Sequence, residues 1–333
     1  MNRIILRNVR SIEHLDVTLR NDWTQKPLDS VLVVGPNGSG KTTLLRVIAG
    51  LWEKFYLKPP KFEEPQSDKF WDFEFTAIQI QELMGQTVWL YWGGKFDVQD
   101  VKQTDIVVQV ARTWSTAYVE QGPQDWLEAF TYQRRKAEVG APDALTLPNL
   151  IYLGVENREV IQPISGDEPS SYFEPSYRWL VTYNATNQPN VALETMLRNA
   201  KLRSESEFYK LLHQINTFYE NKNIFDFDSH LRLVVTLSDG RTHYIEDLSA
   251  GERQCLIQMF MVSRWLREGG VVLIDEPDLH LHVGLQRHFI HEMEKLVTGR
   301  GGQLIVASHS PALWEEYDLR QRISLGQPNP IEG

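Results

Sequence analysis

Eight consecutive residues of this chain have the types and the spacing of a phosphate-binding loop. The pattern G-x-x-x-x-G-K-[ST] is matched in full by Gly35-Pro36-Asn37-Gly38-Ser39-Gly40-Lys41-Thr42. Its glycines let the backbone curl so that successive N–H groups point inward and hold phosphate oxygens. The lysine of such a loop contacts the β- and γ-phosphates, and the hydroxyl of Thr42 would bind Mg²⁺. The sequence therefore predicts that the chain binds ATP together with Mg²⁺.

The segments on either side of this loop have the patterns that the loop requires. Residues 31–34 form a short, continuous apolar run, which is typical of a strand buried on both faces. Residues 42–51 carry apolar side chains at helical spacing. The loop is thus predicted to lie at the start of a helix, whose N-terminus attracts an anion. Thr43, in the first turn of that helix, is included among the predicted nucleotide contacts.

A second apolar run, residues 271–274, ends in two carboxylates, Asp275 and Glu276. Mg²⁺ that is bound to phosphates is held by one or two protein carboxylates, and Asp275 at the end of a strand would supply one. Because successive residues of a strand point in opposite directions, Glu276 would face the γ-phosphate and orient or deprotonate the attacking water. The alternative is a pair of solvated loop acids. We predict that Asp275 is a metal ligand and that Glu276 is the catalytic base.

Three further stretches resemble motifs of ATP-binding-cassette (ABC) ATPases. The signature motif is resembled by Leu248-Ser249-Ala250-Gly251-Glu252-Arg253-Gln254. The switch histidine is resembled by Ser308-His309-Ser310, and the opening of recombination-repair heads by Asn8-Val9-Arg10-Ser11. The order of the loop, the signature, the acid pair and the histidine is that of the family. Residues 277–282 look like the soluble branch, which includes recombination-repair heads and the overcoming-lysogenization-defect ATPases of phage defence.

The resemblance implies roles for these residues. His309 would hydrogen-bond the γ-phosphate and hold Glu276 and the water in line, with Lys41 as a further catalytic group. Arg10 would approach the nucleotide phosphates. The signature would cap the ATP held by a second copy of the chain, so that two ATP molecules are sandwiched in a head-to-tail dimer. The signature residues expected to contact ATP are Ser249, Ala250, Gly251 and Glu252.

Composition and charge limit the classes of protein. The chain has 333 residues, with 34 Lys and Arg against 44 Asp and Glu, and its net charge is −10. This balance argues against a protein that coats nucleic acid through its global charge, although a local basic groove stays open. Two groups of cations are candidates for contacting nucleic acid or an acidic partner, with a solvated face as the alternative: Arg134, Arg135 and Lys136, and Arg198, Lys201, Arg203 and Lys210.

Cysteine content and hydropathy also bear on the environment of the chain. The single cysteine, Cys255, excludes an internal disulfide framework and a cysteine-based zinc site. The first residues are interrupted by charge too soon for a signal peptide. No stretch approaches the roughly 20 apolar residues of a membrane span. We therefore expect a cytoplasmic protein that does not contact a membrane.

The predicted fold class is α/β, a P-loop NTPase of the ABC-ATPase head type. We expect a mixed central sheet, an antiparallel β subdomain and a helical lobe in a single head spanning residues 1–333. The nucleotide-binding core is expected at 1–51 and 246–325, an inserted antiparallel β region at 52–160, and the helical lobe leading to the signature at 161–245. Strand and helix patterns alternate at both ends of the chain, which supports this division.

These predictions imply Mg²⁺-dependent ATP hydrolysis by a homodimer or higher homo-oligomer. The resemblance further implies a role in anti-phage defence, in which the ATPase senses or switches a separate effector such as a nuclease or toxin. Because the chain ends shortly after His309, we expect no appended nuclease domain. The alternatives are a DNA-repair head that clamps DNA, and the ATPase subunit of a membrane transporter, which residues 277–282 disfavour.

Overall fold

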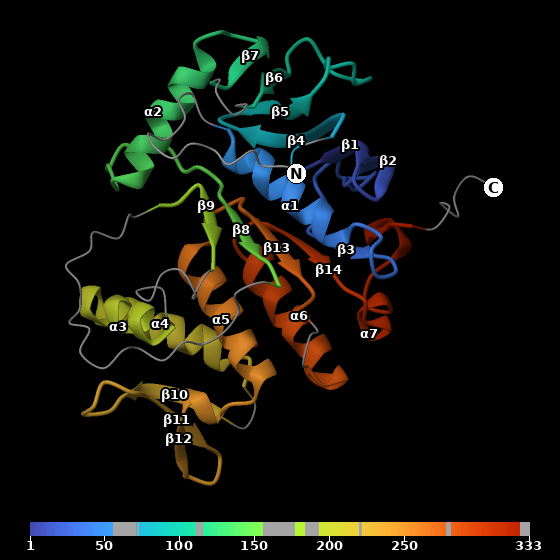
Figure 1. Ribbon diagram of the computed structural model, residues 1–333. Coiled ribbons are helices and arrows are strands. Elements are labelled where there is room, and N and C mark those ends of the chain that lie inside the picture. Colours follow the sequence, from blue (N-terminus) through green and yellow to red (C-terminus); the bar gives the residue numbers. More distant parts are fainter. Residues whose placement is uncertain are drawn as a thin grey trace.

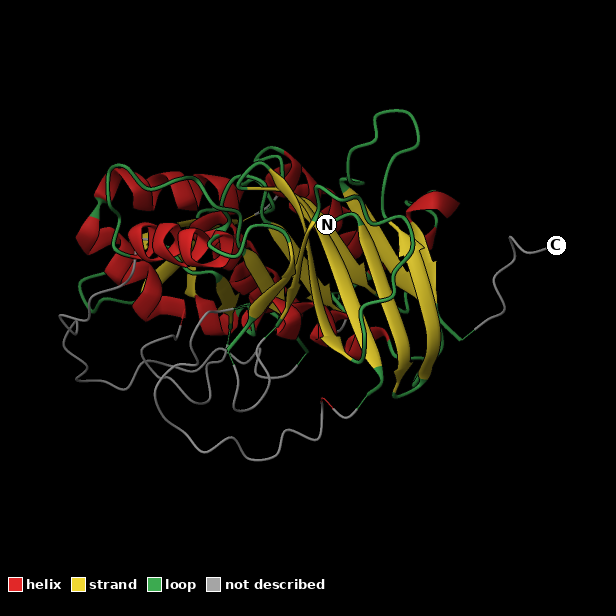
Figure 2. Cartoon of the chain, turned by 90° about the horizontal axis from the view of Figure 1, so that it is seen from above, coloured by secondary structure: helices red, strands yellow, loops and turns green. Residues whose placement is uncertain are grey.

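The computed structural model contains two six-stranded sheets, a small three-stranded sheet and a group of helices (Figure 1). Seen from above, most of the helices gather on one side of the strands (Figure 2). Among the described residues, no helix is both long enough and apolar enough to cross a membrane. The structure describes residues 1–55, 71, 73–110, 116–155, 177–183, 193–219, 222–277 and 281–326.

One six-stranded sheet is parallel at every pairing, with the order β15-β3-β14-β13-β8-β9. The prediction of a mixed central sheet is therefore wrong, because all of its strands run in the same direction. The apolar runs of its middle strands are buried throughout, as expected where helices connect parallel strands and cover the sheet. Its strands are β3 (Ser30–Val34), β8 (Leu150–Leu153), β9 (Leu180–Thr182), β13 (Val271–Asp275), β14 (Gln303–Ala307) and β15 (Arg322–Ser324).

Successive residues of the parallel strands point to opposite faces of the sheet and belong to two different hydrophobic clusters. Val31 and Leu273 pack with α1 (Lys41–Glu53) in one cluster. Their neighbours Leu32 and Ile274 belong to the other cluster, with α5 (Ala250–Trp265) and α6 (Val283–Thr298). This alternation is the period-two geometry of a strand, and it fixes the sheet rigidly between its helices. The predicted helices at both ends of the chain are confirmed.

The second six-stranded sheet has the order β2-β1-β4-β5-β6-β7, and only its β5–β6 pairing is parallel. Strands β1 and β2 form an N-terminal hairpin, and β1 also pairs with β4. After β7 comes α2 (Trp126–Glu138). The strands are β1 (Arg3–Val9), β2 (Ile12–Thr18), β4 (Phe75–Leu83), β5 (Gln86–Gly93), β6 (Ile106–Gln109) and β7 (Tyr118–Gln121).

The expected division of the chain differs from the structure in two places. Strand β8 lies inside the range 52–160, which was expected to form an antiparallel insert, but it pairs in parallel with β13. Conversely, β1 and β2 belong to the antiparallel sheet rather than to the parallel core. A four-residue apolar strand carries no mark of the sheet it joins, since that depends on long-range pairing.

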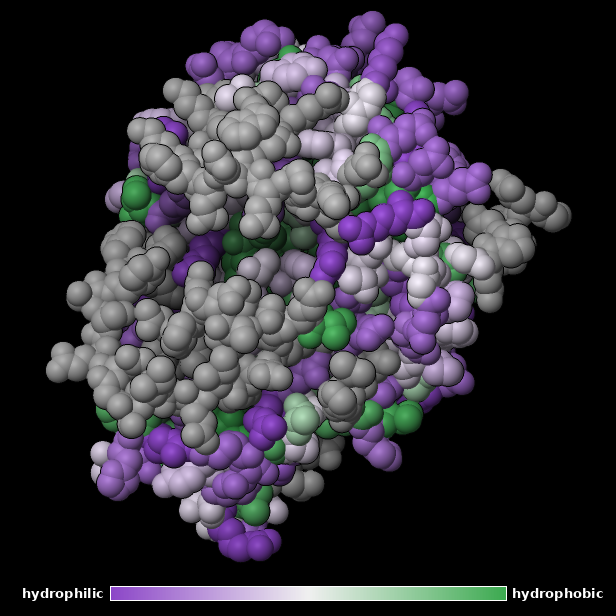
Figure 3. Space-filling model, in the orientation of Figure 1, coloured by the Kyte–Doolittle hydropathy of each residue, from purple (hydrophilic) through white to green (hydrophobic). Residues whose placement is uncertain are grey.

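The lobe before the signature contains helices and a small sheet. The predicted helices are α3 (Leu193–Arg203) and α4 (Glu205–Asn216), and the apolar face of α4 is buried. The sheet joins β10 (Lys222–Phe227), β11 (Leu233–Leu237) and β12 (Thr242–Tyr244). Hydrophilic side chains cover much of the lower part of the molecule, where this sheet lies (Figure 3). Two 3₁₀ helices, η3 (Ile245–Asp247) and η4 (Leu319–Gln321), and the short helix α7 (Pro311–Trp314) complete the described elements.

Candidate nucleotide-binding site

Three parallel strands bring most of the predicted site residues to one edge of the sheet. Strand β14 lies between β3 and β13, and all three run in the same direction. Gly35 follows β3, Asp275 ends β13, and Ser308 and His309 follow β14. Ligands of open parallel sheets bind at the carboxyl ends of the strands. The loop, the acid pair and the histidine therefore meet where a nucleotide would bind.

The loop before α1 has a backbone that glycine makes possible. Gly40 caps α1 with φ +103°, a left-handed conformation that side chains rarely adopt. A Cβ at Gly40 would lie 2.7 Å from the Ile12 side chain, and one at Gly35 would lie 2.5 Å from the carbonyl oxygen of Leu325. The first turn of α1 has no acidic residue and, within the described part of the chain, no capping side chain. These features leave a cradle of backbone N–H groups that fits a phosphate.

Lys41, His309 and Glu276 form a contiguous chain of side chains beside this loop. Lys41 is 5% exposed, and its Nζ donates hydrogen bonds to the carbonyl oxygens of Gly35, at 3.0 Å, and Pro36, at 3.2 Å. The same Nζ lies 2.6 Å from Nε2 of His309. That Nε2 lies 3.3 Å from Oε1 of Glu276. The structure thus brings together the three residues predicted to be catalytic.

The proton on His309 can serve only one of these two neighbours through Nε2. The Lys41 ammonium has donors and no acceptor, so Nε2 must be unprotonated to accept from it. Glu276, when ionised, only accepts, so Nε2 must carry a proton to donate to it. The two contacts of Nε2 therefore exclude each other as hydrogen bonds. Which one forms depends on where the Lys41 ammonium is held.

The acid pair differs in burial and backbone as its predicted roles require. Asp275 is fully buried at the end of β13, whereas the Glu276 side chain is 28% exposed. The backbone turns sharply at Glu276, which has φ +48°, and its N–H donates to the carbonyl oxygen of Ala307 at 2.7 Å. Such a conformation in a residue other than glycine costs about 1–3 kcal/mol and clusters at functional sites. The turn aims the two carboxylates in different directions.

A buried polar pair next to His309 was not predicted from the sequence. Ser310 donates from Oγ to Oε1 of Gln286 on α6, at 2.6 Å, and its N–H donates to Oγ of Ser308 at 2.9 Å. Gln286 also donates to the carbonyl oxygen of Leu281. These bonds fix the backbone on both sides of His309. The only sequence signal was a glutamine on the apolar face of a helix, which gives no indication of its partner.

Arg10 lies on the tight turn between β1 and β2, where its φ is +53°. The neighbouring Ser11 and Ile12 contact Gly40, so this turn packs against the phosphate loop. Asn8, at the start of the turn, donates to Oε2 of Glu74 and ties the turn to the chain before β4. Arg10 is exposed. The turn that carries Arg10 therefore lies beside the phosphate loop, and the contact of Arg10 with nucleotide phosphates stays a prediction.

The signature residues lie elsewhere, at the start of α5. Ser249 and Glu252 form a capping box, in which Oγ of Ser249 accepts from the N–H of Glu252 and Oε2 of Glu252 accepts from the N–H of Ser249. Glu252 also pairs with Lys222 at 2.5 Å. Partial burial would raise the pKa of Glu252, but hydrogen bonds from Lys222 and Ser249 outweigh it and lower that pKa below its ordinary value. Glu252 is thus an anion at neutral pH.

The surroundings of the signature belong to the lobe and not to the loop. Its partners include Tyr219, whose hydroxyl donates to the carbonyl oxygen of Glu252, Lys222, which pairs with Glu252, and Glu246, whose carbonyl oxygen accepts from Arg253. Ser249 and Ala250 are exposed, while Gly251 is buried. In Figure 1, α5 begins beside the β10–β12 sheet, whereas the phosphate loop follows β3. The start of α5 is therefore open to another molecule.

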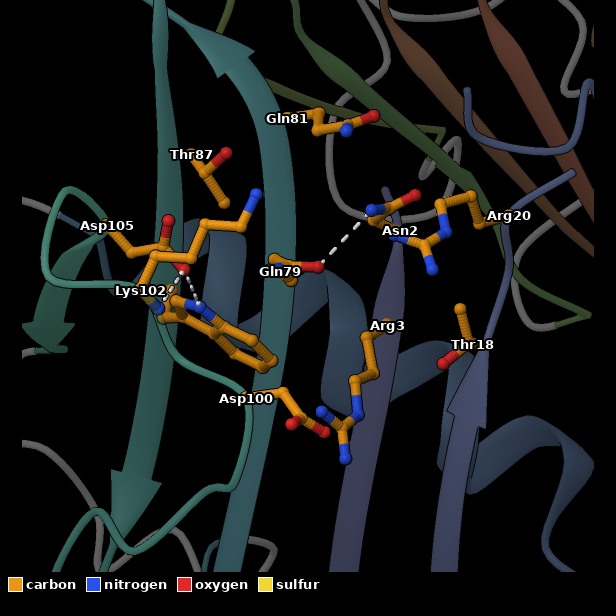
Figure 4. Close-up of a pocket in the computed structure, with 11 residues that line it drawn as sticks. Asn2, Arg3, Thr18, Arg20, Gln79, Gln81, Thr87, Asp100, Lys102 and Asp105 are labelled. Atoms are coloured by element: carbon orange, nitrogen blue, oxygen red, sulfur yellow. Dashed lines mark hydrogen bonds between the residues drawn. The ribbon is translucent and has the colours of Figure 1, made fainter. Parts of the chain in front are cut away.

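A separate polar cavity of about 310 Å³ lies on the antiparallel sheet (Figure 4). Arg3, Gln79 and Trp89 come from the neighbouring strands β1, β4 and β5, in register with one another. Arg3 is held by Asp16, and Trp89 donates to Asp105, so much of its polar lining is already satisfied. None of the predicted site residues lines it. It is distinct from the candidate nucleotide site.

Comparisons with known proteins give matches over most of the chain. A family model described as "AAA domain, putative AbiEii toxin, Type IV TA system" matches residues 132–315. The OLD nuclease of Thermus scotoductus is 26% identical over 330 residues, which cover 93% of this chain and 59% of that protein. Protein ea59 of Escherichia phage lambda is 32% identical over 100 residues, 27% of this chain and 19% of that protein.

A solved structure, the SMC head domain from Thermotoga maritima, matches with a TM-score of 0.46 and 14% identity, covering 97% of this chain and 93% of that one. This chain spans about three fifths of the length of the OLD nuclease. The range of the family model contains the signature, the acid pair and His309, and the phosphate loop precedes it. The predicted resemblance and the α/β P-loop fold class are confirmed.

Proposed function

The chain belongs to the family of AAA domains described as putative AbiEii toxins of type IV toxin–antitoxin systems, and on this premise we propose that it is a Mg²⁺-dependent ATPase. Two copies would sandwich ATP and switch a separate effector, a nuclease or toxin, in the cytoplasm of a prokaryote defending itself against phage. The family description names a putative toxin and the relative is named a nuclease, and our proposal assigns an activity of this kind to a partner protein.

The observation that carries the ATPase proposal is the chain from Lys41 through His309 to Glu276. The loop amides and Lys41 would hold the phosphates, and Thr42 and Asp275 would hold Mg²⁺, which neutralises phosphate charge when bound. Asp275 is buried, whereas Glu276 is partly exposed, with 28% of its side chain accessible. Its place beside His309 suits a base that orients water, since catalysis of phosphoryl transfer is mostly positioning and charge stabilisation.

The two exclusive contacts of His309 suggest how the site changes when ATP binds. In the structure, Lys41 donates hydrogen bonds to carbonyl oxygens of the loop and contacts Nε2 of His309. A triphosphate in the loop would draw the ammonium toward its own oxygens, because charge-assisted bonds to phosphate are stronger. His309 is then released from Lys41. Once Nε2 carries a proton, through the other tautomer or by uptake from solvent, it can donate to Glu276 or to the γ-phosphate. Substrate binding would thereby complete the arrangement around Glu276.

The dimer proposal is supported by the exposed start of α5. Ser249 and Ala250 are exposed and lie at a helix N-terminus, which favours an anion. A second copy would bring its ATP there. Arg10 would add a positive charge near the phosphates of its own chain. The same arrangement would hold each ATP between two copies.

The test of the ATPase is phosphate release by the purified chain with ATP and Mg²⁺, compared with the same mixture containing EDTA. Lys41→Ala should abolish release, because the buried ammonium is lost. Lys26→Ala is the matched control, since Lys26 is exposed and lies away from the loop. If the unaltered chain releases no phosphate above background, or if Lys41→Ala releases as much, the proposal fails.

The effector is tested by expressing the chain from its native genomic segment and isolating it with bound proteins. Co-purification of a neighbouring nuclease or toxin, lost or gained on addition of ATP, is the expected result. Its activity should then depend on whether the ATPase carries Glu276→Gln. A chain that purifies alone from that segment would contradict the switching role while leaving the ATPase proposal intact.

A further inference from the structure

A second, larger cavity of about 720 Å³ lies at the opposite edge of the parallel sheet from the phosphate loop. Its walls are α4, the end of α5 and the turn between α6 and β14, which lead into the amino ends of β13 and β14. The volume falls within the range of about 300–1,000 Å³ that is typical of small-molecule sites. Its charged lining comprises Lys210, Arg264, Arg267 and Arg300 against Glu207 and Glu268.

The cavity concentrates positive charge in a chain whose net charge is −10. Most members of the cation groups noted in the sequence lie elsewhere, and several are already paired: Lys136 with Asp143 and Lys201 with Asp226. Lys210 instead lines this cavity. Burial and the nearby charge of Arg267 lower the pKa of Arg300. Arg267 and Arg300 therefore repel one another, and an anion between them would relieve that repulsion.

The arginine side of the cavity is held in place by hydrogen bonds. Arg300 donates to the carbonyl oxygens of Leu266, at 2.6 Å, and Ser263, at 2.9 Å. The N–H of Arg267 donates to Oδ1 of Asn149, which is fully buried, at 2.9 Å. These bonds fix the backbone and one guanidinium before any ligand arrives, which lowers the entropic cost of binding.

We propose that this cavity binds a phosphate monoester of nucleotide size, at a site separate from the ATP in the phosphate loop. Guanidinium groups match phosphate oxygens through paired hydrogen bonds, and the Lys210 ammonium adds further donors. The ester is either a free mononucleotide or the phosphorylated 5′ end of a nucleic acid strand. Bound there, it bridges α4 of the lobe and the α6–β14 turn of the core.

The experiment uses the full chain with Lys41→Ala, which weakens nucleotide binding in the loop. Calorimetry measures binding of AMP, and of a short single-stranded DNA with and without a 5′-phosphate. One equivalent of AMP or of the phosphorylated strand is expected to bind, and the strand without phosphate is not. Binding of AMP identifies a free nucleotide as the source, and binding of the phosphorylated strand alone identifies a strand end.

Variants of the cavity decide whether the binding occurs there. Arg267→Gln and Lys210→Gln should each weaken binding about tenfold, the effect of losing one charge-assisted bond. Arg241→Gln, on an exposed hairpin, removes the same charge and should leave affinity unchanged. Arg267→Gln and Lys210→Gln should weaken binding without lowering the melting temperature, which separates ligand contact from a structural role. No binding in the Lys41→Ala chain, or affinity unaffected by the cavity variants, would overturn the proposal.

Discussion

Two helices of the chain, α1 and α5, begin at small residues that are predicted to contact phosphate. Their N-termini differ in whether a carboxylate of the chain already occupies them. At α1, Gly40 caps the helix through its backbone, and the first turn holds no carboxylate. At α5, Ser249 caps the helix with its side chain, and Glu252 closes the capping box. The α1 terminus is open to an anion, whereas the α5 terminus already contacts an anion of its own.

The comparison shows that a helix N-terminus is a phosphate site only when its donors are available. The α1 terminus also has Lys41, His309 and Glu276 assembled around it within one chain. For the α5 terminus to receive ATP from a second copy, the Glu252 carboxylate must stay clear of the phosphate or be displaced by it. Dimer formation therefore carries an electrostatic cost that binding in the loop does not.

The largest expected effect tests the assembled side of the comparison. Glu276→Gln should lower turnover by about 10²–10⁴-fold, the usual contribution of a general base. ATP binding should persist, and the ATP-bound dimer should accumulate because hydrolysis no longer releases it. Phosphate release and light scattering measure the two effects. Glu315→Gln, near the surface, is the control, and wild-type turnover in Glu276→Gln would remove this residue from the mechanism.

The next effect tests the α5 side. Ser249→Arg should bind ATP normally and yet lose about 10²-fold in turnover, as when one donor to the transition state is removed. The defect lies across the interface, so mixing this variant with Lys41→Ala protein should restore one working site per mixed dimer. Turnover of the mixture is compared with that of each variant alone. A mixture as inactive as its components would refute the sandwich.

A smaller effect is expected from the cap of α1. Gly40→Ala places a Cβ 2.7 Å from Ile12 on a left-handed backbone, so the loop must shift. We expect about tenfold weaker ATP binding, which corresponds to roughly 1.4 kcal/mol. Calorimetry with ATP and Mg²⁺ measures it, and Gly85→Ala, on the turn between β4 and β5, controls for general backbone strain. Unchanged affinity would mean that the loop tolerates a Cβ there.

The smallest effect concerns the cap of α5. Glu252→Gln should lower stability by about 1 kcal/mol at neutral pH, as for lost helix caps. Because the pKa of Glu252 is lowered in the fold, its stabilising contribution is present above its ordinary pKa and disappears as the pH falls through the folded-state pKa. Urea unfolding of both chains should therefore converge at low pH. The variant should also dimerise more readily with ATP, and weaker dimerisation would contradict the cost described above.

Local patterns predicted the parts of the fold with strong signals. The phosphate loop has a recognisable motif. The strands β3, β13 and β14 are continuous apolar runs, and α4 has apolar residues at helical spacing. Strands β9 and β15 have three residues each, too few for a period to be recognised, and β10 has mostly polar or half-exposed residues. The parallel direction of the central sheet depends on how the crossovers pass, which no single segment contains.

In the candidate site, too, some features could be predicted from local sequence patterns and others could not. Residues next to one another in the motifs were predicted, because the chemistry is carried by residue type and spacing. The contact of Lys41 with His309 joins residues far apart in the chain and follows only from the strand order. The bond between Gln286 and Ser310, and the Lys222 partner of Glu252, likewise depend on packing between elements.

At position 276, the left-handed backbone favours glycine, whereas the proposed chemistry needs a glutamate. Glycine adopts φ +48° without the steric penalty that a glutamate bears there. Loss of the carboxylate through Glu276→Gly would therefore relieve backbone strain and yield a chain that folds at least as well. Under the proposed mechanism, the fold would not oppose natural drift toward an inactive form, and selection for hydrolysis would keep a glutamate at this turn.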